Sequence, residues 1–473
     1  MKKLIALLCT ITCLCSTVSV RAQWEMPRKI SIADTSAGLN ENMGQCLAVA
    51  GDSVHAVWVD YANKQGRIFY AHSYDNGTTW STGAQISGTR NSAGFPSISV
   101  SGRFVHVAYR DTTGSSYESW YVRSSDAGMT WSAPVSLGKF YWWPSITSDG
   151  ASVYVALNDN LGTNSEVFFR RSLDNGITWD TVVRISNAAG RSEDPSIAAS
   201  DGFVYLVWND NRTGIMQTWF RRSTDNGVTW ENERQLSNSP TFAYFPMVHA
   251  VHEKVDVVYG DRASSNFEVY YTGSSDNGLS FSKPSQITHS GATSAYPVLT
   301  RVGTRLALVY WIMSADAFVV NSSDDGSTWS TPSMLVPKSN TPSSPFIVAT
   351  PAAEHIIYVD QREGHKEIYY TRLLATTNDV ATVAMSDQRL MIAYPNPAHR
   401  HATIVVENAS RVERAEITLF DEAGQKILTH NLGPIEKGKT EIPIDLSNAA
   451  QAIYGRLIGD GRLLGECRIS NTH

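Results

Sequence analysis

This 473-residue sequence has few cysteines, few charged residues and no recurring helical period. Three of its five cysteines lie in the first 22 residues, so only Cys46 and Cys467 are left for a disulfide and the fold does not depend on a disulfide framework. There is no Gly-x-Ser-x-Gly turn, phosphate-binding loop or cysteine-rich metal site. The sequence therefore contains no motif for a serine nucleophile, for nucleotide binding or for a cysteine-rich zinc site.

Residues 1–22 have the order of parts found in a secretory signal peptide: two lysines, an apolar run over residues 4–14 and a small-residue cleavage site. A lipoprotein signal would use Cys13 or Cys15, but neither has the small-residue context that this processing needs. We expect a mature chain that starts at Gln23 and has no transmembrane segment. Loss of the signal removes three positive charges and takes the formal net charge from -6 to about -9. This acidity argues against nucleic acid or an anionic membrane as partner.

The most prominent feature of the sequence is an eight-residue phrase, Ser-x-Asp-x-Gly-x-Thr-Trp, that occurs six times with minor variation. The steps between its aspartates are 51, 48, 51, 51 and 48 residues. A fixed period near fifty indicates an array of equivalent supersecondary units. Short β-branched and aromatic runs separated by Gly, Asn and Asp predict four strands in each unit. The six aspartates are Asp75, Asp126, Asp174, Asp225, Asp276 and Asp324.

A seventh unit lacks the phrase and is predicted to be completed from the other end of the chain. First-strand openings recur seven times, but the last unit stops after residues 367–372 without a fourth strand. Residues 24–31 have the pattern of the fourth strands at 281–288 and 329–335. Pairing the first and last segments would close the array into a ring. The sequence therefore predicts an all-β fold in which residues 23–375 form a seven-bladed β-propeller closed by the N-terminal strand.

The repeated phrase is similar to the Asp-box, or BNR repeat, of sialidase-like propellers. In a tight hairpin the Asp accepts hydrogen bonds from turn amides, the Gly supplies a positive φ and the Trp packs into the blade, so the six aspartates are expected to be structural. The resemblance implies that these turns lie on the face opposite the binding site. A Ca²⁺ ion would need more oxygen donors than even the most acidic copy, at residues 323–326, provides. No metal or cofactor is predicted.

Candidate ligand-binding residues lie at the opposite ends of the strands. An Asp closes the second strand in six of seven units, with Ile312 in the other, and an Arg follows in three. Aromatic residues precede several first strands, and aromatic surfaces beside arginines suit sugars. The aspartates could instead cap turns and the aromatics could wedge the blades. The candidates include Asp210 and Asp261 at second-strand ends and the aromatic residues Trp143 and Tyr296. Positions that break the symmetry of the ring are the better candidates: Arg212, Arg262, Arg362, His365, Trp142 and Tyr244.

Sialidase chemistry is the enzymatic alternative. The resemblance implies three arginines, a Tyr nucleophile assisted by Glu and an Asp acid, with the first arginine in a Phe/Tyr-Arg-Ile-Pro phrase. That phrase is absent, and the glutamates recur on third strands, so no catalytic residue is assigned. We predict a monomeric, non-catalytic binding protein for an extracellular glycan or glycoprotein. A sialidase-type exo-glycosidase and a protein-interaction scaffold are the alternatives.

The last part of the chain resembles the C-terminal sorting domain of the type nine secretion system. It follows a polar linker at 376–387 and contains Tyr394-Pro-Asn-Pro397, then Leu419-Phe-Asp-Glu-Ala-Gly-Gln425, then Ala452-Ile-Tyr454 in place of Gly-x-Tyr. The resemblance implies that residues 388–473 direct the chain to the outer-membrane secretion machinery, and that the protein is secreted or held at the cell surface. The strand pattern predicts a small β-sandwich, for which a binding module is the alternative.

Overall fold

The computed structural model describes residues 24–374, apart from 33–35, 41–43, 62–64, 89–91, 114–115, 140, 160–163, 264, 313–315 and 336–341, together with 391–394, 401–408, 412–421, 426–436, 438–445, 452–459 and 462–470. The chain divides into two compact units, Met1–Val380 and Ala381–His473. The predicted signal peptide and linker lie outside the described residues. The described part contains no helix that is long and apolar enough to span a membrane.

The first unit consists of seven antiparallel sheets, or blades, numbered here in chain order. Blade 1 contains β2 (Ala37–Gly38), β3 (Leu47–Ala50), β4 (Ser53–Asp60), β5 (Arg67–Ser73) and β6 (Ala84–Gln85). Blade 2 contains β7 (Ala93–Ser101), β8 (Phe104–Thr113), β9 (Ser116–Ser124) and β10 (Val135–Lys139). Blade 3 contains β11 (Tyr141–Asp149), β12 (Ser152–Asp159), β13 (Val167–Ser172) and β14 (Val183–Arg184). Blade 4 contains β15 (Ser192–Ser200), β16 (Phe203–Asp210), β17 (Gln217–Ser223) and β18 (Arg234–Gln235).

The remaining blades repeat the same four-strand order. Blade 5 contains β19 (Ala243–Val251), β20 (Lys254–Asp261), β21 (Glu268–Ser274) and β22 (Ser285–Gln286). Blade 6 contains β23 (Ser294–Val302), β24 (Arg305–Ile312), β25 (Ala317–Ser322) and β26 (Ser333–Met334). Blade 7 contains β27 (Ser343–Ala349), β28 (Ala353–Asp360), β29 (Glu367–Leu374) and, from the other end of the chain, β1 (Arg28–Lys29).

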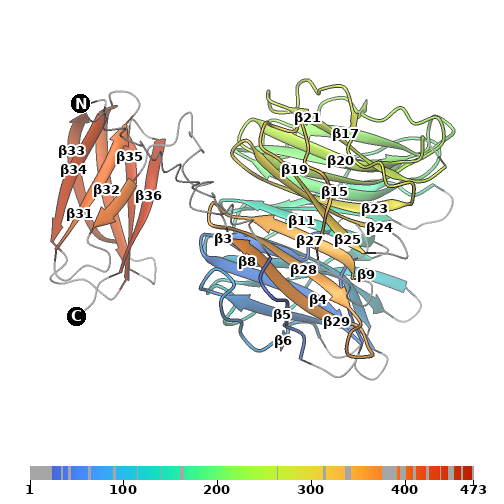
Figure 1. Cartoon of the computed structure of the whole chain (residues 1–473), viewed down its shortest axis with the longest axis horizontal. Helices are drawn as coiled ribbons and strands as arrows, with labels where there is room; N and C mark the ends of the chain where they lie inside the picture. Colours follow the sequence, from blue (N-terminus) through green and yellow to red (C-terminus); the bar gives the residue numbers. More distant parts are fainter. Residues whose placement is uncertain are drawn as a thin grey trace, which may run out of the picture. The chain divides into compact units, whose positions relative to one another are not determined.

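The ring closes where the two ends of the array meet. Strand β1 pairs with β29 through Arg28↔Tyr370 and Lys29↔Tyr369. Figure 1 shows the orange strands of blade 7 next to the blue strands of blade 1, where β27 contacts β3 and β29 contacts β2. This arrangement confirms the predicted seven-bladed propeller and its N-terminal closing strand. The outer edge of each blade is a short strand of two to five residues, whereas the inner edge strands contact those of the neighbouring blades.

Ion pairs reinforce this closure. The Lys29 ammonium lies 3.0 Å from Glu363 Oε2 and 3.1 Å from Glu367 Oε1, and the Glu367 carboxylate also accepts a hydrogen bond from Ser31. Ligand atoms of Glu363, His365 and Glu367 lie within 4.8 Å of one another, a spacing that a metal ion could use. The ammonium offsets one of the two carboxylate charges and connects β1 to blade 7, so we call this cluster the closure latch.

The core lies in the second strand of each blade. Strands β4, β12, β16 and β20 are buried along all but their first residue. A strand buried on both faces reads as a nearly continuous apolar run, as in Val204–Trp208. The inner strands of successive blades are joined by hydroxyl groups, for example Ser97 Oγ, which accepts a hydrogen bond from Ile146 N at 3.1 Å. The corresponding position in blade 1 is Cys46, a free and buried thiol whose pKa burial raises to about 12.

Each Asp-box turn uses its aspartate internally. In blade 4, Asp225 Oδ1 accepts hydrogen bonds from Ser223 Oγ at 2.7 Å and Thr229 N at 2.8 Å, while Oδ2 accepts from Thr229 Oγ1 at 2.6 Å. The Gly227 amide donates to Ser223 Oγ at 2.8 Å. These bonds, led by the Thr229 hydroxyl, hold the pKa of Asp225 at about 2. The same bonds form around Asp75, Asp126, Asp174, Asp276 and Asp324.

The Gly and the final aromatic residue of each Asp-box also pack against the preceding blade. The Tyr121 ring of blade 2 packs edge-on against Trp179 of blade 3, with centroids 4.9 Å apart. Gly176 has a φ of +78°, and a Cβ there would lie 1.9 Å from the Tyr121 hydroxyl oxygen. Equivalent pairs, 4.8 to 5.4 Å apart, are Trp80–Tyr370, Trp131–Tyr70, Trp230–Phe169, Phe281–Phe220 and Trp329–Tyr271. The repeated phrase thus stabilises its own turn and also joins two blades, and we call this contact between blades the inter-blade clasp.

The second unit forms two facing sheets. One sheet contains β30 (Met391–Tyr394), β31 (His401–Asn408) and β34 (Gly438–Asp445), and the other contains β33 (Lys426–Ile435), β32 (Val412–Asp421), β35 (Ala452–Gly459) and β36 (Arg462–Ser470). Its buried core includes Ile417, Leu419 and Ile442. This arrangement confirms the predicted small β-sandwich.

Candidate functional site

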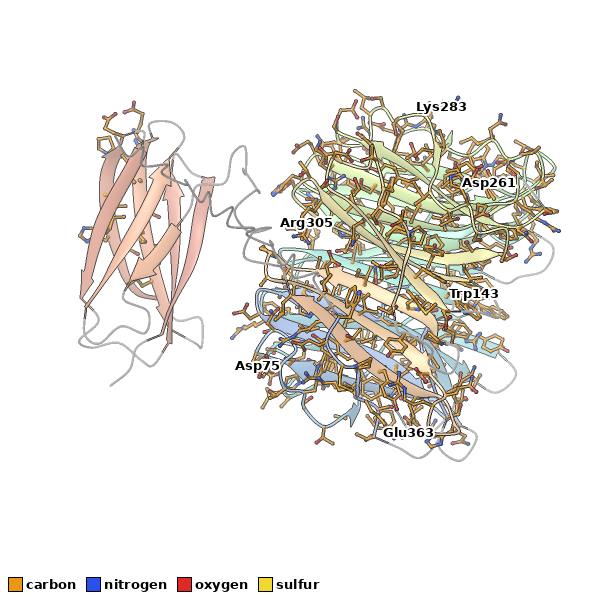
Figure 2. The ribbon with its side chains drawn as sticks, viewed as in Figure 1. Asp75, Trp143, Asp261, Lys283, Arg305 and Glu363 are labelled. Carbon is orange, nitrogen blue, oxygen red and sulfur yellow. The ribbon has the colours of Figure 1, made fainter. Side chains whose placement is uncertain are left out.

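The antiparallel strands place two sets of loops on opposite faces of the propeller. The Asp-box turns lie where third strands end, whereas the predicted site residues lie where second strands end and first strands begin. Figure 2 shows Asp75 on one side of the unit and Trp143 and Asp261 on the other. We call the second side the ligand face, and the first-strand ends on it the inner rim, because the inner strands of neighbouring blades contact one another around the ring.

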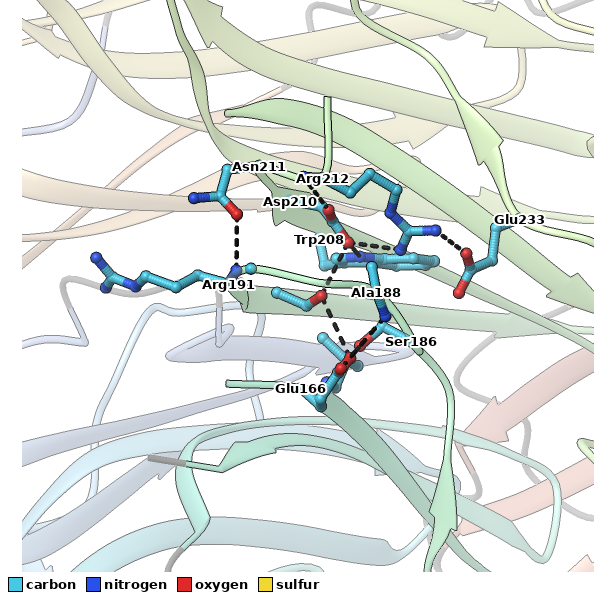
Figure 3. A network of polar contacts seen from close by, with 12 residues as sticks. Glu166, Ser186, Ala188, Arg191, Trp208, Asp210, Asn211, Arg212 and Glu233 are labelled. Carbon is cyan, nitrogen blue, oxygen red and sulfur yellow. Dashed lines mark hydrogen bonds and ion pairs between the residues drawn. The ribbon is translucent and has the colours of Figure 1, made fainter. Parts of the chain in front are cut away.

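Arg212 is engaged within its own blade. Its Nη2 lies 2.6 Å from Asp210 Oδ2 and its Nη1 pairs with Glu233 (Figure 3). Its guanidinium lies 4.2 Å from the ring centroid of Trp219. Burial opposes the charge, but these two carboxylates raise the pKa of Arg212 above its ordinary value. Asp210 is itself buried and also accepts a hydrogen bond from Ser192 Oγ at 2.8 Å. The pair braces the outer part of blade 4.

Arg362 repeats this geometry in blade 7. Its Nη2 lies 2.6 Å from Asp360 Oδ2, and its guanidinium lies 4.2 Å from the ring centroid of Tyr369. The neighbouring His365 bonds to Glu367 in the closure latch at 2.7 Å.

Arg262 differs, because its side chain is exposed and, within the described residues, forms no ion pair. Its Nε donates to Ser265 O at 3.2 Å. Asp261 accepts a hydrogen bond from Ser239 Oγ at 2.6 Å. The structure therefore does not bring the three predicted arginines together around one ligand position.

A strained backbone position shapes the inner rim. In six blades the residue before the first-strand proline has a φ between +43° and +59°, and the pairing with the second strand shifts register there. Left-handed φ values are uncommon outside glycine, and such strain often accompanies function. The six residues are Phe95, Trp143, Asp194, Phe245, Tyr296 and Ser344, and register assigns Gly44 to the same place in blade 1.

One aromatic cluster occupies the rim of blades 2 and 3. Trp142 and Trp143 are in edge contact, with centroids 5.2 Å apart, and Trp143 lies 6.4 Å from Phe95. Tyr117 packs edge-on against Trp142 at 4.7 Å. The guanidinium of Arg110 lies 4.3 Å from the Phe95 centroid, 4.5 Å from that of Tyr117 and 5.3 Å from that of Trp142. We call these four rings and Arg110 the Trp142 cluster.

A second aromatic cluster occupies the rim of blades 5 and 6. Phe245 lies 4.3 Å from Tyr296 and 5.9 Å from both Tyr244 and Phe267, measured between centroids. Tyr296 stacks on Trp311 at 6.2 Å. We call these five rings the Tyr244 cluster. All five keep part of their surface exposed to solvent.

Blade 4 places acids between the two clusters. Asp194 takes the strained rim position, and its Oδ2 accepts a hydrogen bond from Asn209 Nδ2 at 2.9 Å. Although part of the side chain reaches solvent, desolvation by the surrounding protein and then the nearby Glu193 raise the pKa of Asp194 to about 7. Glu193 is buried and pairs with the exposed Arg191. Such a carboxyl can donate or accept a hydrogen bond near neutral pH.

The structure thus gathers Trp142 and Trp143 in one cluster and Tyr244 and Tyr296 in the other, whereas Arg212, Arg362 and their aspartates serve their own blades. Sequence reasoning missed Arg110 and Asp194. Register could have found them: Arg110 pairs with Gly94, next to the rim position of Phe95, and Asp194 stands where other blades carry aromatic residues.

Comparison with solved structures agrees with this fold. The polysaccharide lyase Uly1 matches with a TM-score of 0.52 and 10% identity over 74% of this chain and 99% of that one. A PL25 ulvan lyase, solved bound to -[GlcA(1-4)Rha3S]-, gives 0.50 and 10% over 75% and 98%. A Trypanosoma rangeli sialidase mutant with trans-sialidase activity gives 0.43 and 11% over 94% and 90%. Identities this low show the fold alone. No curated protein matches the sequence.

The fold and its six Asp-boxes define a sialidase-like, seven-bladed β-propeller. The BNR repeat-like domain matches residues 14–257, just over half of the sequence, and the chain belongs to that family. The secretion system C-terminal sorting domain matches residues 392–462. The tail therefore directs export through the type nine system to the cell surface or the extracellular space.

Proposed function

We propose that this exported protein is a non-catalytic glycan-binding propeller whose ligand docks on the inner rim of the ligand face. The observation that carries the proposal is the pair of partly exposed aromatic clusters, built on neighbouring first strands and separated by polar groups. Aromatic rings cover the C–H faces of sugars, while nearby polar groups bond to hydroxyls. Trp142, Trp143, Tyr244 and Tyr296 would form the stacking surfaces, with the exposed Arg262 at the edge.

The proposal is tested by glycan-array binding followed by titration calorimetry on the purified protein. Replacing Tyr244 with Ala should weaken binding roughly 10-fold, because a ring contact and its buried area are lost. Tyr74→Ala is the matched control, since Tyr74 is an exposed tyrosine in an Asp-box on the opposite face. No binding to any glycan, or equal effects of the two variants, would refute the proposal. Protein partners with which glycans do not compete would favour an interaction scaffold.

One observation keeps an exo-glycosidase as the second candidate. Asp194 has a raised pKa, as a general acid requires, and the pKa of neighbouring Tyr244 is raised by burial and by Glu193. Against this, Arg212 and Arg362 are occupied within their blades, so the expected arginine clamp has no support from them. Hydrolysis of a fluorogenic sialoside by the wild type, lost in Asp194→Asn, would establish the enzyme.

We also propose that the signal peptide is removed and that the chain acts as a monomer, because ring closure leaves only short outer edges. Light scattering of the exported protein and sequencing of its N-terminus test these two points.

A further inference from the structure

Arg110 is a rim cation without a carboxylate partner among the described residues. It lies near the end of β8, where the corresponding residue of blade 4 is the neutral Asn209. Its guanidinium contacts three rings, and its Nε is buried without a hydrogen-bond acceptor. The Nε atoms of Arg212 and Arg362 are likewise buried without an acceptor, but each of these arginines has an aspartate 2.6 Å from its Nη2, which Arg110 lacks in the described part of the chain.

This environment leaves Arg110 short of acceptors but still charged. An arginine in a protein keeps its charge even when burial lowers its pKa, as it does here. The aromatic rings stabilise the cation through their faces but accept no strong hydrogen bond from its N–H groups. The two terminal Nη groups, which are not among the buried atoms, have no hydrogen-bond acceptor among the described residues, and paired N–H groups of this kind match the oxygens of a carboxylate or a sulfate. The Trp142 cluster is therefore preorganised for an anionic group attached to a stackable ring.

The neighbouring part of the rim carries the opposite charge. Asp194 and the buried Glu193 lie in blade 4, beyond Trp143 of blade 3. Arg191 pairs with Glu193, so Asp194 is the carboxyl at this position for which the described residues offer no cationic partner, and it can bond to a sugar hydroxyl but disfavours a second acidic group. Beyond blade 4, the Tyr244 cluster presents rings and no charged side chain.

The two clusters are separate, and the rim position of blade 4 lies between them. Among the described residues no ring contact links them, because the blade 4 position between them is occupied by Asp194. A ligand that contacts both clusters would therefore also pass over the Asp194 position.

We propose that the inner rim recognises an internal stretch of a glycan chain in which an anionic sugar, carrying a carboxylate or a sulfate ester, docks at Arg110 and an uncharged sugar lies over Asp194. This inference rests on the proposed glycan-binding function and names its ligand class. It predicts a preference for chains in which charged and neutral sugars alternate.

The test is titration calorimetry of the purified protein with five named oligosaccharides. Hyaluronan hexasaccharide carries a carboxylate on alternate sugars, and κ-carrageenan hexasaccharide carries a sulfate on alternate sugars, so the two distinguish the source of the anion. Hexagalacturonate is charged on every sugar, chitohexaose is neutral, and hyaluronan disaccharide tests length. One alternating hexasaccharide should bind about 10-fold or more tightly than the last three, and this advantage should shrink as salt increases.

Arg110→Gln keeps most of the side-chain volume and removes the charge. It should lower affinity for the alternating chain roughly 10- to 100-fold and leave chitohexaose binding unchanged. Arg103→Gln is the matched control, because Arg103 directly precedes β8 and its carbonyl accepts a hydrogen bond from Ala127 N in the Asp-box turn on the opposite face. Thermal unfolding of both variants checks that the blade is intact.

The outcomes separate this inference from the broader function. If neutral and alternating chains bind equally and Arg110→Gln has no effect, while Tyr244→Ala still weakens binding, glycan binding stands and the anionic subsite is refuted. Equal affinity for hexagalacturonate would refute the uncharged position over Asp194, and equal affinity for the disaccharide would refute the extended mode. If no glycan in the panel or on the array binds, both proposals fail together.

Discussion

The inter-blade clasp makes a prediction in which two glycines of the same blade behave differently. Gly176, in the Asp-box of blade 3, and Gly150, in the turn between β11 and β12, both have positive φ values, +78° and +57°. A Cβ at Gly150 would meet nothing within 4 Å. A Cβ at Gly176 would lie 1.9 Å from the Tyr121 hydroxyl oxygen and 2.5 Å from its ring carbon. Alanine therefore adds the same backbone strain at both sites but a clash at only one.

The magnitudes follow from these two terms. A left-handed alanine costs about 1 to 2 kcal/mol relative to glycine, which is the whole effect expected for Gly150→Ala. Displacing the fully buried Tyr121 adds about 1 to 3 kcal/mol of overpacking, so Gly176→Ala should lower the free energy of unfolding by about 2 to 5 kcal/mol.

Urea unfolding followed by tryptophan fluorescence measures both variants against the wild type. A double-mutant cycle with Tyr121→Ala should remove the extra cost, because the ring that the new methyl group strikes is gone. Equal midpoints for Gly176→Ala and Gly150→Ala, or additivity in the cycle, would show that the Asp-box glycine serves only its own turn.

Three further predictions concern charged groups. Hydrogen bonds hold the pKa of Asp225 at about 2, below its unfolded value near 3.9. The stability that this carboxylate contributes is therefore present above pH 4 and is lost as pH falls toward 2. Asp225→Asn should flatten the dependence of the thermal unfolding temperature on pH over that range. The pKa of Asp194 is raised to about 7, so its ionisation destabilises the fold as pH rises, and Asp194→Asn should stabilise the protein more at pH 8 than at pH 4 in the same assay. Lys29→Met leaves Glu363 and Glu367 without their cation and should cost about 1 to 3 kcal/mol, with faster hydrogen exchange in β29.

The fold was largely predictable because its determinants are local. Repeated aspartates mark equivalent turns, and the likeness of residues 24–31 to the fourth strands at 281–288 and 329–335 predicted ring closure, which the pairing of Lys29 with Tyr369 confirms. Turn chemistry and strand pattern operate over a few residues and can be read without knowing the distant partner. The clasp of Gly176 on Tyr121 was not foreseen, because it joins residues 55 positions apart in different blades.

The site was less predictable because side-chain direction decides it. Arg212 and Arg362 were attractive candidates by type and place, yet an aspartate two residues earlier accepts each of them at 2.6 Å. Arg110 gave no signal of its own, since its partners Phe95, Tyr117 and Trp142 come from two other strands of blade 2 and from blade 3. Identifying such a cluster requires the register of neighbouring strands, which a single sequence leaves open.

The backbone of the inner rim repeats from blade to blade, whereas its side chains vary. A left-handed residue before proline is unfavourable in isolation, yet six blades hold it, so the strain belongs to the ring and not to one contact. The backbone therefore supplies the same projecting position repeatedly, and the side chain placed there is not dictated by the turn. Phe95 and Trp143 make one part of the rim aromatic, Asp194 makes the next acidic, and Phe245 and Tyr296 return it to aromatic. Because each position can vary without disturbing the clasps on the other face, the ligand that we propose for the inner rim would be selected by this order of side chains, while the Asp-boxes maintain the ring that presents them.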